Sequence, residues 1–347
     1  MSKKIDITTT KIGVVGGGAW GTALAKLLAD KGFILDLWVF EKEVKEQIET
    51  NRENKIFLPN IKLPENIIPS NDLEKVVSKK DFVLVVVPSH CMRDIAGRMK
   101  KFVSSKTIIA TASKGIENKT HMTMTQILAE KIDFLPEENL GVISGPSFAK
   151  EVANKVPTVV AAASTSRKTA EYIQKIFSCS TFRVYVNDDP VGTQLGGAMK
   201  NVLAIAAGIC DGMKMGLNPR AALITRGLTE MNRLGTKLGA NPLTLSGLAG
   251  VGDLLLTCTG ALSRNYTVGR QIGEGKKPDQ IISEMRMVAE GVKTTRSVYN
   301  LSKKLGVDLP ICNKVYQVLF EDAPVKETVD YLMTRSLKHE LNGILNH

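Results

Sequence analysis

Two lysines occupy positions where an amine can do acid–base chemistry. Lys200 lies inside the apolar run GTQLGGAMKNVLAIAAGI, residues 192–209, which is typical of a buried helix. Lys114 directly follows an apolar run that we expect to be a buried strand. A buried ammonium is costly unless its pKa falls or an anion pairs with it. Lys200 is therefore a candidate general acid/base whose pKa is lowered by burial and by a second cation such as Lys114. The alternative is a lysine at the helix edge whose amine reaches solvent.

Groups that suit an anionic substrate follow later in the chain. The segment GLAGVGD places Asp253 after a glycine stretch that we expect to be flexible, and Thr257 follows four residues later. Ser263, Arg264 and Asn265 then open a further helix, and both arginine and helix-start N–H groups are good phosphate ligands. Each signal has a plain alternative, because Asp253 can serve as an N-cap and Ser-Arg-Asn is an ordinary helix start.

A glycine-rich turn near the N-terminus predicts dinucleotide binding. The apolar run Ile12–Val15 leads into GGGAWG, residues 16–21, and a helical pattern follows. Gly16, Gly18 and Gly21 thus form G-x-G-x-x-G in a strand–turn–helix setting. The first glycine permits the tight turn, the second lets backbone approach a pyrophosphate, and the third lets the helix pack on its strand. The alternative is a glycine turn that only joins a strand to a helix.

The end of the next strand bears on the choice of cofactor. ILDLWVF, residues 34–40, reads as the second strand, and Glu41 follows it. An acid about 20 residues beyond the glycines usually binds the adenosine ribose. Asp36 has the spacing, but we favour Glu41, because only the end of the strand reaches the ribose. No arginine follows immediately, which favours NAD over NADP. The alternative is a surface glutamate that opens the next helix.

The order of elements predicts an α/β fold with two domains. Buried strands are expected at 81–88, 107–113, 140–144, 158–163 and 182–186, with a helix over 121–131 and a proline-broken loop over 51–70. From about Asp189 onward helical patterns take over, at 191–215, 219–238, 288–305 and 309–320. We predict a Rossmann-type dinucleotide-binding domain over residues 1–188 and an all-α substrate-binding, catalytic domain over residues 189–347.

The composition is that of a globular protein, with 43% hydrophobic and 23% charged residues in a chain of 347. Lys and Arg number 46 against 35 Asp and Glu, which gives a formal net charge of +11. The basic residues are scattered, without a long run or interleaved aromatic residues. We therefore expect no nucleic-acid partner and favour small phosphorylated ligands.

Cysteine and histidine spacing predicts no metal site. The five cysteines lie far apart without a C-x-x-C, and no two of the four histidines have metal-ligand spacing. A reducing, cytoplasmic setting is the default for such a chain. The N-terminus lacks an apolar signal core. The most apolar segment, Leu195–Ile209, is short and carries Lys200, so we expect a buried helix and no membrane span.

Several longer motifs together resemble the sn-glycerol-3-phosphate dehydrogenases. Besides the glycine turn they are SKG at 113–115, GPSFAKE at 145–151, AMKNVLAIAAGICDGMKMGLNPRAAL from 198, GLAGVGDLLLTCTGALSRNYTVG from 247 and VAEGV at 288–292. The resemblance covers nearly the whole chain in the family's order. It implies interconversion of dihydroxyacetone phosphate and glycerol 3-phosphate with NAD or NADP, for phospholipid synthesis. It also implies a homodimer.

The resemblance also implies roles for individual residues. A lysine matching Lys200 acts as acid/base on the C2 oxygen, one matching Lys114 contacts the substrate, and Asp253 is expected to orient Lys200. The other matching substrate positions are Gly145, Ser147, Asn201, Thr257, Ser263, Arg264 and Asn265. With the fingerprint glycines, the expected cofactor positions are Ala19, Trp20, Phe40, Glu41, Lys114, Ala149, Arg264, Val288 and Glu290.

Two residues depart from the pattern of many bacterial members. Phe40 stands where they have Arg or His, which puts a preference for NADP in doubt. Ala19 replaces a common Ser and loses one possible hydroxyl contact to the pyrophosphate.

Two other functions share parts of this sequence pattern. Another dehydrogenase of the same architecture, for 6-phosphogluconate or a hydroxy acid, is disfavoured by the SRN and GPSFA motifs. A non-catalytic dinucleotide sensor would not need Lys114, Lys200 and Asp253.

Overall fold

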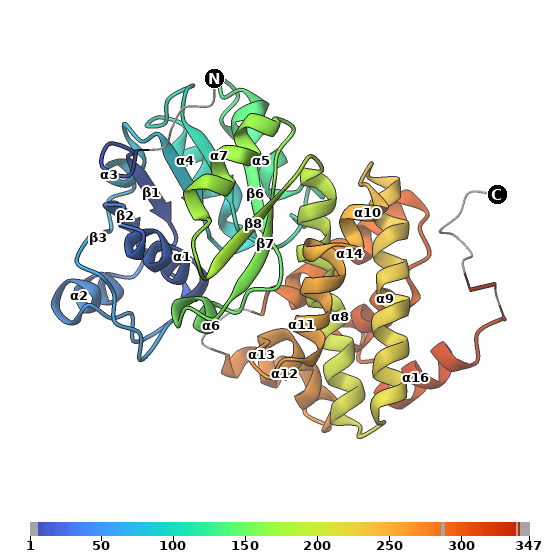
Figure 1. Cartoon of the computed structure of the whole chain (residues 1–347). Coiled ribbons are helices and arrows are strands. Elements are labelled where there is room, and N and C mark those ends of the chain that lie inside the picture. The colour runs from blue at the N-terminus through green and yellow to red at the C-terminus, as the bar shows by residue number, and fades with distance from the viewer. Residues whose placement is uncertain (1–5, 286–288, 338, 341–347) are drawn as a thin grey trace. The chain divides into compact units, whose positions relative to one another are not determined.

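The computed structural model describes residues 6–285, 289–337 and 339–340 (Figure 1). Their contacts divide the chain into two compact units. The first holds the described residues up to Ser113 together with Met124–Pro190, and the second holds Lys114–Thr123 together with the described residues from Val191 onward. The short segment Lys114–Thr123 therefore packs with the helical unit, although it interrupts the first unit in sequence. A single boundary at 188/189 does not express this, and the functional division into two domains stays a prediction.

The first unit is built on one sheet, which among the described residues has eight strands in the order β3-β2-β1-β4-β5-β6-β7-β8. The strands from β3 to β6 in this order are parallel, β7 is antiparallel to β6, and β8 is parallel to β7. The strands are β1 (Ile12–Val15), β2 (Leu35–Trp38), β3 (Ile67–Ser70), β4 (Phe82–Val85), β5 (Ile108–Thr111), β6 (Leu140–Ser144), β7 (Thr158–Ala163) and β8 (Phe182–Asn187).

Helices cover both faces of this sheet. Successive side chains of a strand point to opposite faces. Ile12 and Val14 of β1 belong to a buried apolar cluster with residues of helices α1 and α7, whereas a Cβ on Gly13 would meet Val76 of α3. The helices of this unit are α1 (Ala19–Asp30), α2 (Lys42–Asn51), α3 (Leu73–Val77), η1 (Ser89–Cys91), α4 (Met92–Met99), α5 (Met124–Lys131), η2 (Glu137–Asn139), α6 (Ala149–Ala153) and α7 (Arg167–Phe177).

The loop predicted over residues 51–70 is wrong at its end. Ile67–Ser70 form β3, in which Pro69 stands opposite Leu37 of β2. Proline lacks the N–H that an inner strand must donate, so it is confined to edge strands, and β3 is the first strand of the sheet order. Prolines favour a loop in the sequence, because the sequence alone does not reveal that a strand lies at an edge. The predicted helix over 121–131 begins later, at Met124.

The second unit is helical, as predicted from the patterns after Asp189. Its long central helix, α8, buries nearly every residue from Gly192 to Cys210, including Lys200. The start predicted at Val288 lies outside the described residues. The helices are α8 (Pro190–Gly212), α9 (Leu217–Lys237), α10 (Pro242–Leu245), the π-helix η3 (Leu248–Gly252), α11 (Asp253–Thr259), α12 (Arg264–Gly273), α13 (Pro278–Glu284), α14 (Glu290–Leu305), α15 (Pro310–Phe320) and α16 (Val325–Met333). The predicted fold class is thereby confirmed.

One stretch in the described part of the chain, Pro242–Thr259, is long and apolar enough to pass a test for a membrane span. It is a succession of α10, η3 and α11 and carries the buried carboxylate of Asp253. Core helices of soluble proteins pass the same test, so this stretch is weak evidence for a span.

Candidate active site

A buried carboxylate joins the two predicted lysines in the second unit. Asp253 is fully buried, and its Oδ1 accepts a hydrogen bond from Lys200 Nζ at 2.6 Å. Its Oδ2 accepts from Lys114 Nζ, also at 2.6 Å. Thr257 Oγ1 lies 2.9 Å from Lys200 Nζ and donates to the Asp253 carbonyl. Asp253 does not act as the side-chain N-cap that was one alternative. It opens α11 and holds both amines.

The surroundings of Lys200 lower its pKa to about 8, from an ordinary 10.5. Burial is the largest cause, because it disfavours the charged form. The Asp253 carboxylate acts in the opposite direction, and the nearby Lys114 cation lowers the pKa further. The predicted burial of Lys200 is confirmed, whereas an edge position with its amine in solvent is wrong. An amine that titrates near neutral pH is suited to give and take protons.

Close backbone contacts set where Asp253 lies relative to Lys200. A Cβ on Gly196, one helical turn before Lys200 in α8, would stand 2.3 Å from the carbonyl oxygen of Ala249 in η3. A Cβ on Gly250 would stand 1.8 Å from the Leu245 carbonyl oxygen. The stretch before Asp253 is a π-helix, η3, in which Ala249 and Gly250 are buried. These glycines are required by close approach, which sequence alone cannot distinguish from flexibility.

The segment that carries Lys114 is tied to α14. Ser297 Oγ lies 2.8 Å from both the Ile116 carbonyl oxygen and Asn118 Oδ1. Ile116 itself is buried in the apolar core of this unit. The anchored backbone explains why Lys114 reaches an aspartate 139 positions later in the sequence.

A second polar group connects α8, α12 and α14. Asn265 Nδ2 donates to Asn201 Oδ1 at 2.9 Å, and Asn265 Oδ1 accepts from the Gly291 N–H at 2.9 Å. Ser263 Oγ accepts from the Tyr266 N–H and so caps α12, as its helix-start pattern predicted. Three predicted substrate residues thus gather at the start of α12, where N–H groups favour an anion.

Arg264 and Glu290 are linked electrostatically. Arg264 is the first residue of α12. Desolvation lowers the pKa of its guanidinium below its ordinary value, and the Glu290 carboxylate acts in the opposite direction. Glu290 is the first residue of α14. Val288, the remaining predicted cofactor residue of this part of the chain, lies outside the described residues.

In the first unit the glycine turn has the geometry that the fingerprint predicts. Gly16 has φ +125°, and a Cβ there would stand 2.2 Å from the Val86 carbonyl oxygen. A Cβ on Gly21 would stand 1.9 Å from the Gly16 carbonyl oxygen. At Gly18, by contrast, a Cβ would meet no described heavy atom within 4 Å. Gly18 is the N-cap residue of α1, which Ala19 and Trp20 open.

The residues after β2 follow the carboxyl end of a strand parallel to β1. Phe40 is 73% exposed and its ring lies edge-on to Trp38, with 6.2 Å between centroids. Glu41 is the exposed N-cap residue of α2. Asp36, the other candidate for the ribose, forms an ion pair with Lys80 at 2.5 Å within the first unit. The geometry favours Glu41 over Asp36, since the Asp36 carboxylate already has a cationic partner.

The GPSFA motif follows the carboxyl end of β6. Gly145 has φ +154°, and a Cβ there would stand 2.9 Å from the Val160 Cα. Ser147 Oγ donates to the Gly145 carbonyl at 2.9 Å. Ala149 opens α6, which packs against α1. The motif therefore lies at the same edge of the sheet as the carboxyl ends of the other parallel strands.

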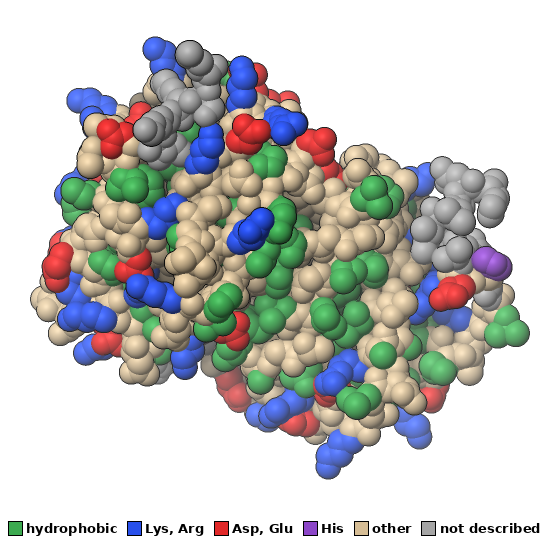
Figure 2. Space-filling model, viewed as in Figure 1, with side chains coloured by type: hydrophobic (Ala, Val, Ile, Leu, Met, Phe, Trp, Pro, Cys, Tyr) green, Lys and Arg blue, Asp and Glu red, His purple; other side chains and the backbone are tan. Residues whose placement is uncertain are grey.

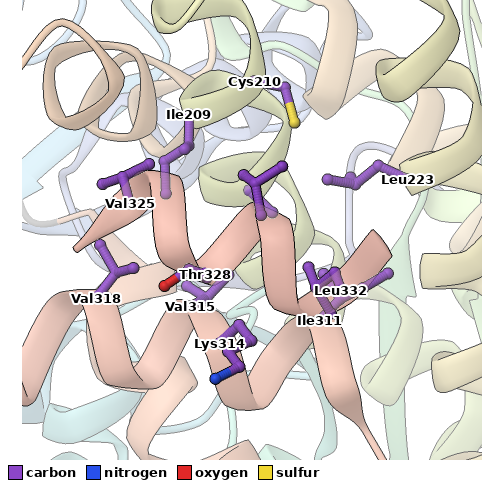
Figure 3. A pocket seen from close by; sticks show the side chains of 12 residues that line it. Ile209, Cys210, Leu223, Ile311, Lys314, Val315, Val318, Val325, Thr328 and Leu332 are labelled. Atoms are coloured by element: carbon purple, nitrogen blue, oxygen red, sulfur yellow. The ribbon is translucent and has the colours of Figure 1, made fainter. Parts of the chain in front are cut away.

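A small cavity of about 40 Å³ in the helical unit is lined by none of these residues (Figure 3). It is lined mainly by apolar side chains of α8, α9, α15 and α16, among them Ile209, Leu223, Val315 and Leu332. Without convergent polar groups it is not a candidate for the chemistry. Among the described residues no group of three His, Cys, Asp or Glu is placed to hold a metal ion, and the expectation of no metal stays a prediction.

Comparison with known proteins identifies the family. Residues 11–170 match the model of the NAD-dependent glycerol-3-phosphate dehydrogenase N-terminus, and residues 189–330 match that of its C-terminus. A glycerol-3-phosphate dehydrogenase (NAD(P)+) of Syntrophobacter fumaroxidans is 51% identical over 330 residues, which are 95% of this chain and 97% of that protein. The chain belongs to the NAD-dependent glycerol-3-phosphate dehydrogenase family. A relative of the same name from Citrifermentans bemidjiense is 53% identical over 333 residues, 95% of this chain and 98% of that protein.

The fold agrees with a solved structure of this dehydrogenase family. The glycerol-3-phosphate dehydrogenase of Coxiella burnetii superimposes with a TM-score of 0.90 at 39% sequence identity, covering 94% of this chain and 99% of that one. The resemblance inferred from the motifs is thereby confirmed.

The glycine turn fits the dinucleotide that the dehydrogenase family implies. Open space beside Gly18 leaves room for a group that a side chain would exclude, and the first turn of α1 carries no acid to repel a pyrophosphate. Trp20 Nε1 is buried and finds no hydrogen-bond partner in the described part of the chain. N–H donors at a helix start, next to such an opening, are suited to phosphate.

One residue that contacts this turn is not indicated by any sequence motif. Asn54 lies in the segment between α2 and β3 and is fully buried, with its side chain on the glycine turn. An asparagine in a proline-broken stretch looks like any loop residue. Only its burial in the folded chain distinguishes it.

Proposed function

We propose that this protein interconverts dihydroxyacetone phosphate and sn-glycerol 3-phosphate with NAD or NADP. The observation that carries the proposal is the buried Lys200, held between Asp253, Lys114 and Thr257 with a pKa of about 8. When bound, the nicotinamide cofactor supplies or accepts the hydride at C2 of the substrate. Family membership and the name of the curated relatives support this reaction.

In the reducing direction Lys200 Nζ donates a proton to the C2 oxygen as negative charge develops there. The ketone becomes an alcohol, and Lys200 is left as a neutral amine that regains its proton from solvent. In the oxidising direction the neutral amine takes the hydroxyl proton. The Asp253 carboxylate holds the amine in place, while Lys114 adds positive charge that favours the developing alkoxide.

The substrate phosphate is assigned to the start of α12. Arg264 supplies a guanidinium, and Ser263, Asn265 and the first N–H groups of α12 supply neutral hydrogen-bonding groups. The other predicted substrate residues are Gly145, Ser147, Asn201 and Thr257. The dinucleotide is assigned to Gly16, Gly18, Ala19, Trp20, Gly21, Phe40, Glu41, Lys114, Ala149, Arg264, Val288 and Glu290.

The function is tested by following absorbance at 340 nm with dihydroxyacetone phosphate and NADH. Lys200→Ala is expected to lower kcat roughly 10³-fold or more, because general acid catalysis is lost. Lys200→Arg keeps the cation, yet it is expected to fail as well, since guanidinium does not release its proton. The exposed Lys237→Ala serves as a matched control and keeps parental turnover. A Lys200→Ala enzyme with turnover within a few-fold of the parent would exclude Lys200 as the acid/base.

NADH is expected to be preferred over NADPH. The strand end carries Glu41, whose carboxylate repels a 2′-phosphate, and Phe40, which cannot pair with one. We expect a higher kcat/KM with NADH in the same assay. Phe40→Arg is expected to raise the relative kcat/KM for NADPH about tenfold. A parental enzyme with the higher kcat/KM for NADPH would contradict the assignment.

We further infer that the protein is a homodimer, acts in the cytoplasm and supplies glycerol 3-phosphate for phospholipid synthesis. These three statements rest on the resemblance to the family and on the cysteine pattern.

A further inference from the structure

A segment outside the fingerprint is bonded into the glycine turn. Asn54 is fully buried, and its Nδ2 donates to the Gly17 carbonyl at 2.7 Å and to Thr22 Oγ1 at 2.9 Å. Thr22 Oγ1 donates in turn to the same Gly17 carbonyl at 3.2 Å. One side chain thus joins the turn to the first residues of α1.

Asn54 is itself held in place by hydrogen bonds from the residues that follow it. Its Oδ1 accepts from the Phe57 N–H at 3.1 Å, and its backbone carbonyl accepts from the Leu58 N–H at 2.9 Å. Both amide hydrogens and the amide oxygen therefore have partners within the first unit. An asparagine satisfied in this way has a single orientation, because a flip would place donor against donor and acceptor against acceptor.

The consequence for the turn follows from the planarity of the peptide group. In a trans peptide the C=O of one residue and the N–H of the next point in opposite directions. A Gly17 carbonyl held by Asn54 and Thr22 therefore turns the Gly18 N–H away from Asn54. Gly17 and Gly18 tolerate many backbone conformations when free. The two side-chain bonds therefore fix the orientation of the peptide plane between Gly17 and Gly18.

A second asparagine of the same segment provides a built-in comparison. Asn66 Nδ2 donates to the Ala29 carbonyl at 2.8 Å and to the Phe33 carbonyl at 2.7 Å. Like Asn54, Asn66 thus donates two hydrogen bonds from its side-chain amide. Its acceptors, however, lie at the C-terminal end of α1, away from the glycine turn. Replacing Asn66 therefore measures how much the loss of two such hydrogen bonds lowers the stability of the fold, without a change at the glycine turn.

We propose that Asn54 is a positioning residue for dinucleotide binding, which sets the backbone of the glycine turn in its binding arrangement before the dinucleotide arrives. The proposal rests on the proposed function in so far as that function requires a dinucleotide on this turn. Preorganisation of this kind lowers the entropy that the ligand would otherwise have to overcome on binding.

The test compares Asn54→Asp with Asn66→Asp by isothermal titration calorimetry with NADH and with NADPH. The aspartate keeps the size of Asn54 and its acceptor for the Phe57 N–H, but it loses the donors to Gly17 and Thr22 and adds a negative charge. Its effect on Kd is therefore compared with that of an uncharged variant, Thr22→Val. We expect the Kd of both dinucleotides to rise about tenfold, equivalent to about 1.4 kcal/mol. At saturating cofactor, kcat is expected to stay within threefold of the parent. Asn66→Asp, at a half-buried position, is expected to lower the Tm less than Asn54→Asp does and to keep both Kd values within twofold.

Thr22→Val removes the hydroxyl that bonds to Gly17 and Asn54 and nearly keeps the volume of the side chain. We expect this variant to raise the Kd of both dinucleotides about threefold. Thr22→Val adds no charge, so a rise in Kd for Asn54→Asp without one for Thr22→Val would indicate repulsion by the new carboxylate and would overturn the proposal. If Asn54→Asp does not fold, Thr22→Val is the deciding variant. Unchanged Kd values in the folded variants, or an equal rise in Asn66→Asp, would overturn the proposal. A parent enzyme that binds neither NADH nor NADPH would instead refute the proposed function, so the two failures are distinguishable.

Discussion

Lys200 shows how one residue acquires a chemical property from its neighbours. Burial in α8 lowers the pKa of its amine, Asp253 limits the fall, and Lys114 adds to it, with a result of about 8. Without Asp253 a buried ammonium would be uncompensated, and without burial the amine would hold its proton too tightly for exchange near neutral pH. The same carboxylate also fixes the position of the amine, through a bond of 2.6 Å.

The pH dependence of the reaction follows from this pKa. Ketone reduction needs the protonated amine, so kcat/KM is expected to be level below about pH 8 and to fall tenfold per pH unit above it. Alcohol oxidation needs the neutral amine and is expected to rise up to about pH 8 and then level off. Initial rates at low substrate, measured from pH 6 to 10 in both directions, check this.

A matched variant tests the cause of the shift. The Lys114 cation lowers the pKa of Lys200. Lys114→Met is therefore expected to shift the fall of kcat/KM for ketone reduction to higher pH, and also to lower the activity itself. A reduction rate that stays level from pH 7 to 10 in the parent would contradict the role of Lys200.

At the scale of elements, glycines decide how closely helices approach. Gly196 of α8 packs against the backbone of η3, and η3 leads directly into Asp253 at the start of α11. The separation of α8 and η3 therefore sets the separation of Lys200 and Asp253. A π-helix is uncommon and occurs often at functional sites.

Gly196→Ala is expected to disturb the site without touching a reacting group. Its Cβ would stand 2.3 Å from the Ala249 carbonyl oxygen, so α8 and η3 must move apart. We expect kcat to fall about 100-fold, together with a lower Tm. The measurement is steady-state kinetics with thermal unfolding. Gly97→Ala, in α4, is the control, because its Cβ would meet no described atom within 4 Å. Its kcat should stay unchanged, and the stability of the helix should rise slightly. Parental kcat in Gly196→Ala would show that this contact does not set the site.

At the scale of the molecule, the 46 Lys and Arg residues are scattered along the sequence. On the face shown in Figure 2, Lys and Arg side chains are scattered among Asp and Glu and form no single continuous patch. This distribution agrees with a small anionic substrate better than with a nucleic acid. Large apolar side chains such as Leu243, Leu262 and Met333 are exposed on the helical unit, and exposed apolar surface is often used in self-association.

The proposed homodimer predicts a mass in solution of twice the 37.7 kDa of the chain. Most soluble oligomers are closed symmetric assemblies of identical chains, and dimers are the commonest. Size-exclusion chromatography with light scattering checks the mass over a range of concentrations. A mass of one chain throughout that range would contradict the dimer.

The sequence by itself determined features that depend on local pattern. Continuous apolar runs predicted β1 and β4, helical periodicity predicted α8, and the spacing of Gly16, Gly18 and Gly21 predicted the turn between β1 and α1. These features are local because backbone sterics and burial of one face act over a few residues. Motifs in the family's order were sufficient to predict the family.

Only the tertiary structure decided features that depend on distant partners. Pro69 lies in a strand because β3 is at the edge of the sheet. Gly250 is packed because the backbone of α10 lies against it. Lys114 and Lys200 share one carboxylate, and Asn54 reaches the glycine turn 37 positions earlier. A hydrogen bond between such residues exists only once the chain has folded, because burial removes water as the competing partner and makes the bond specific.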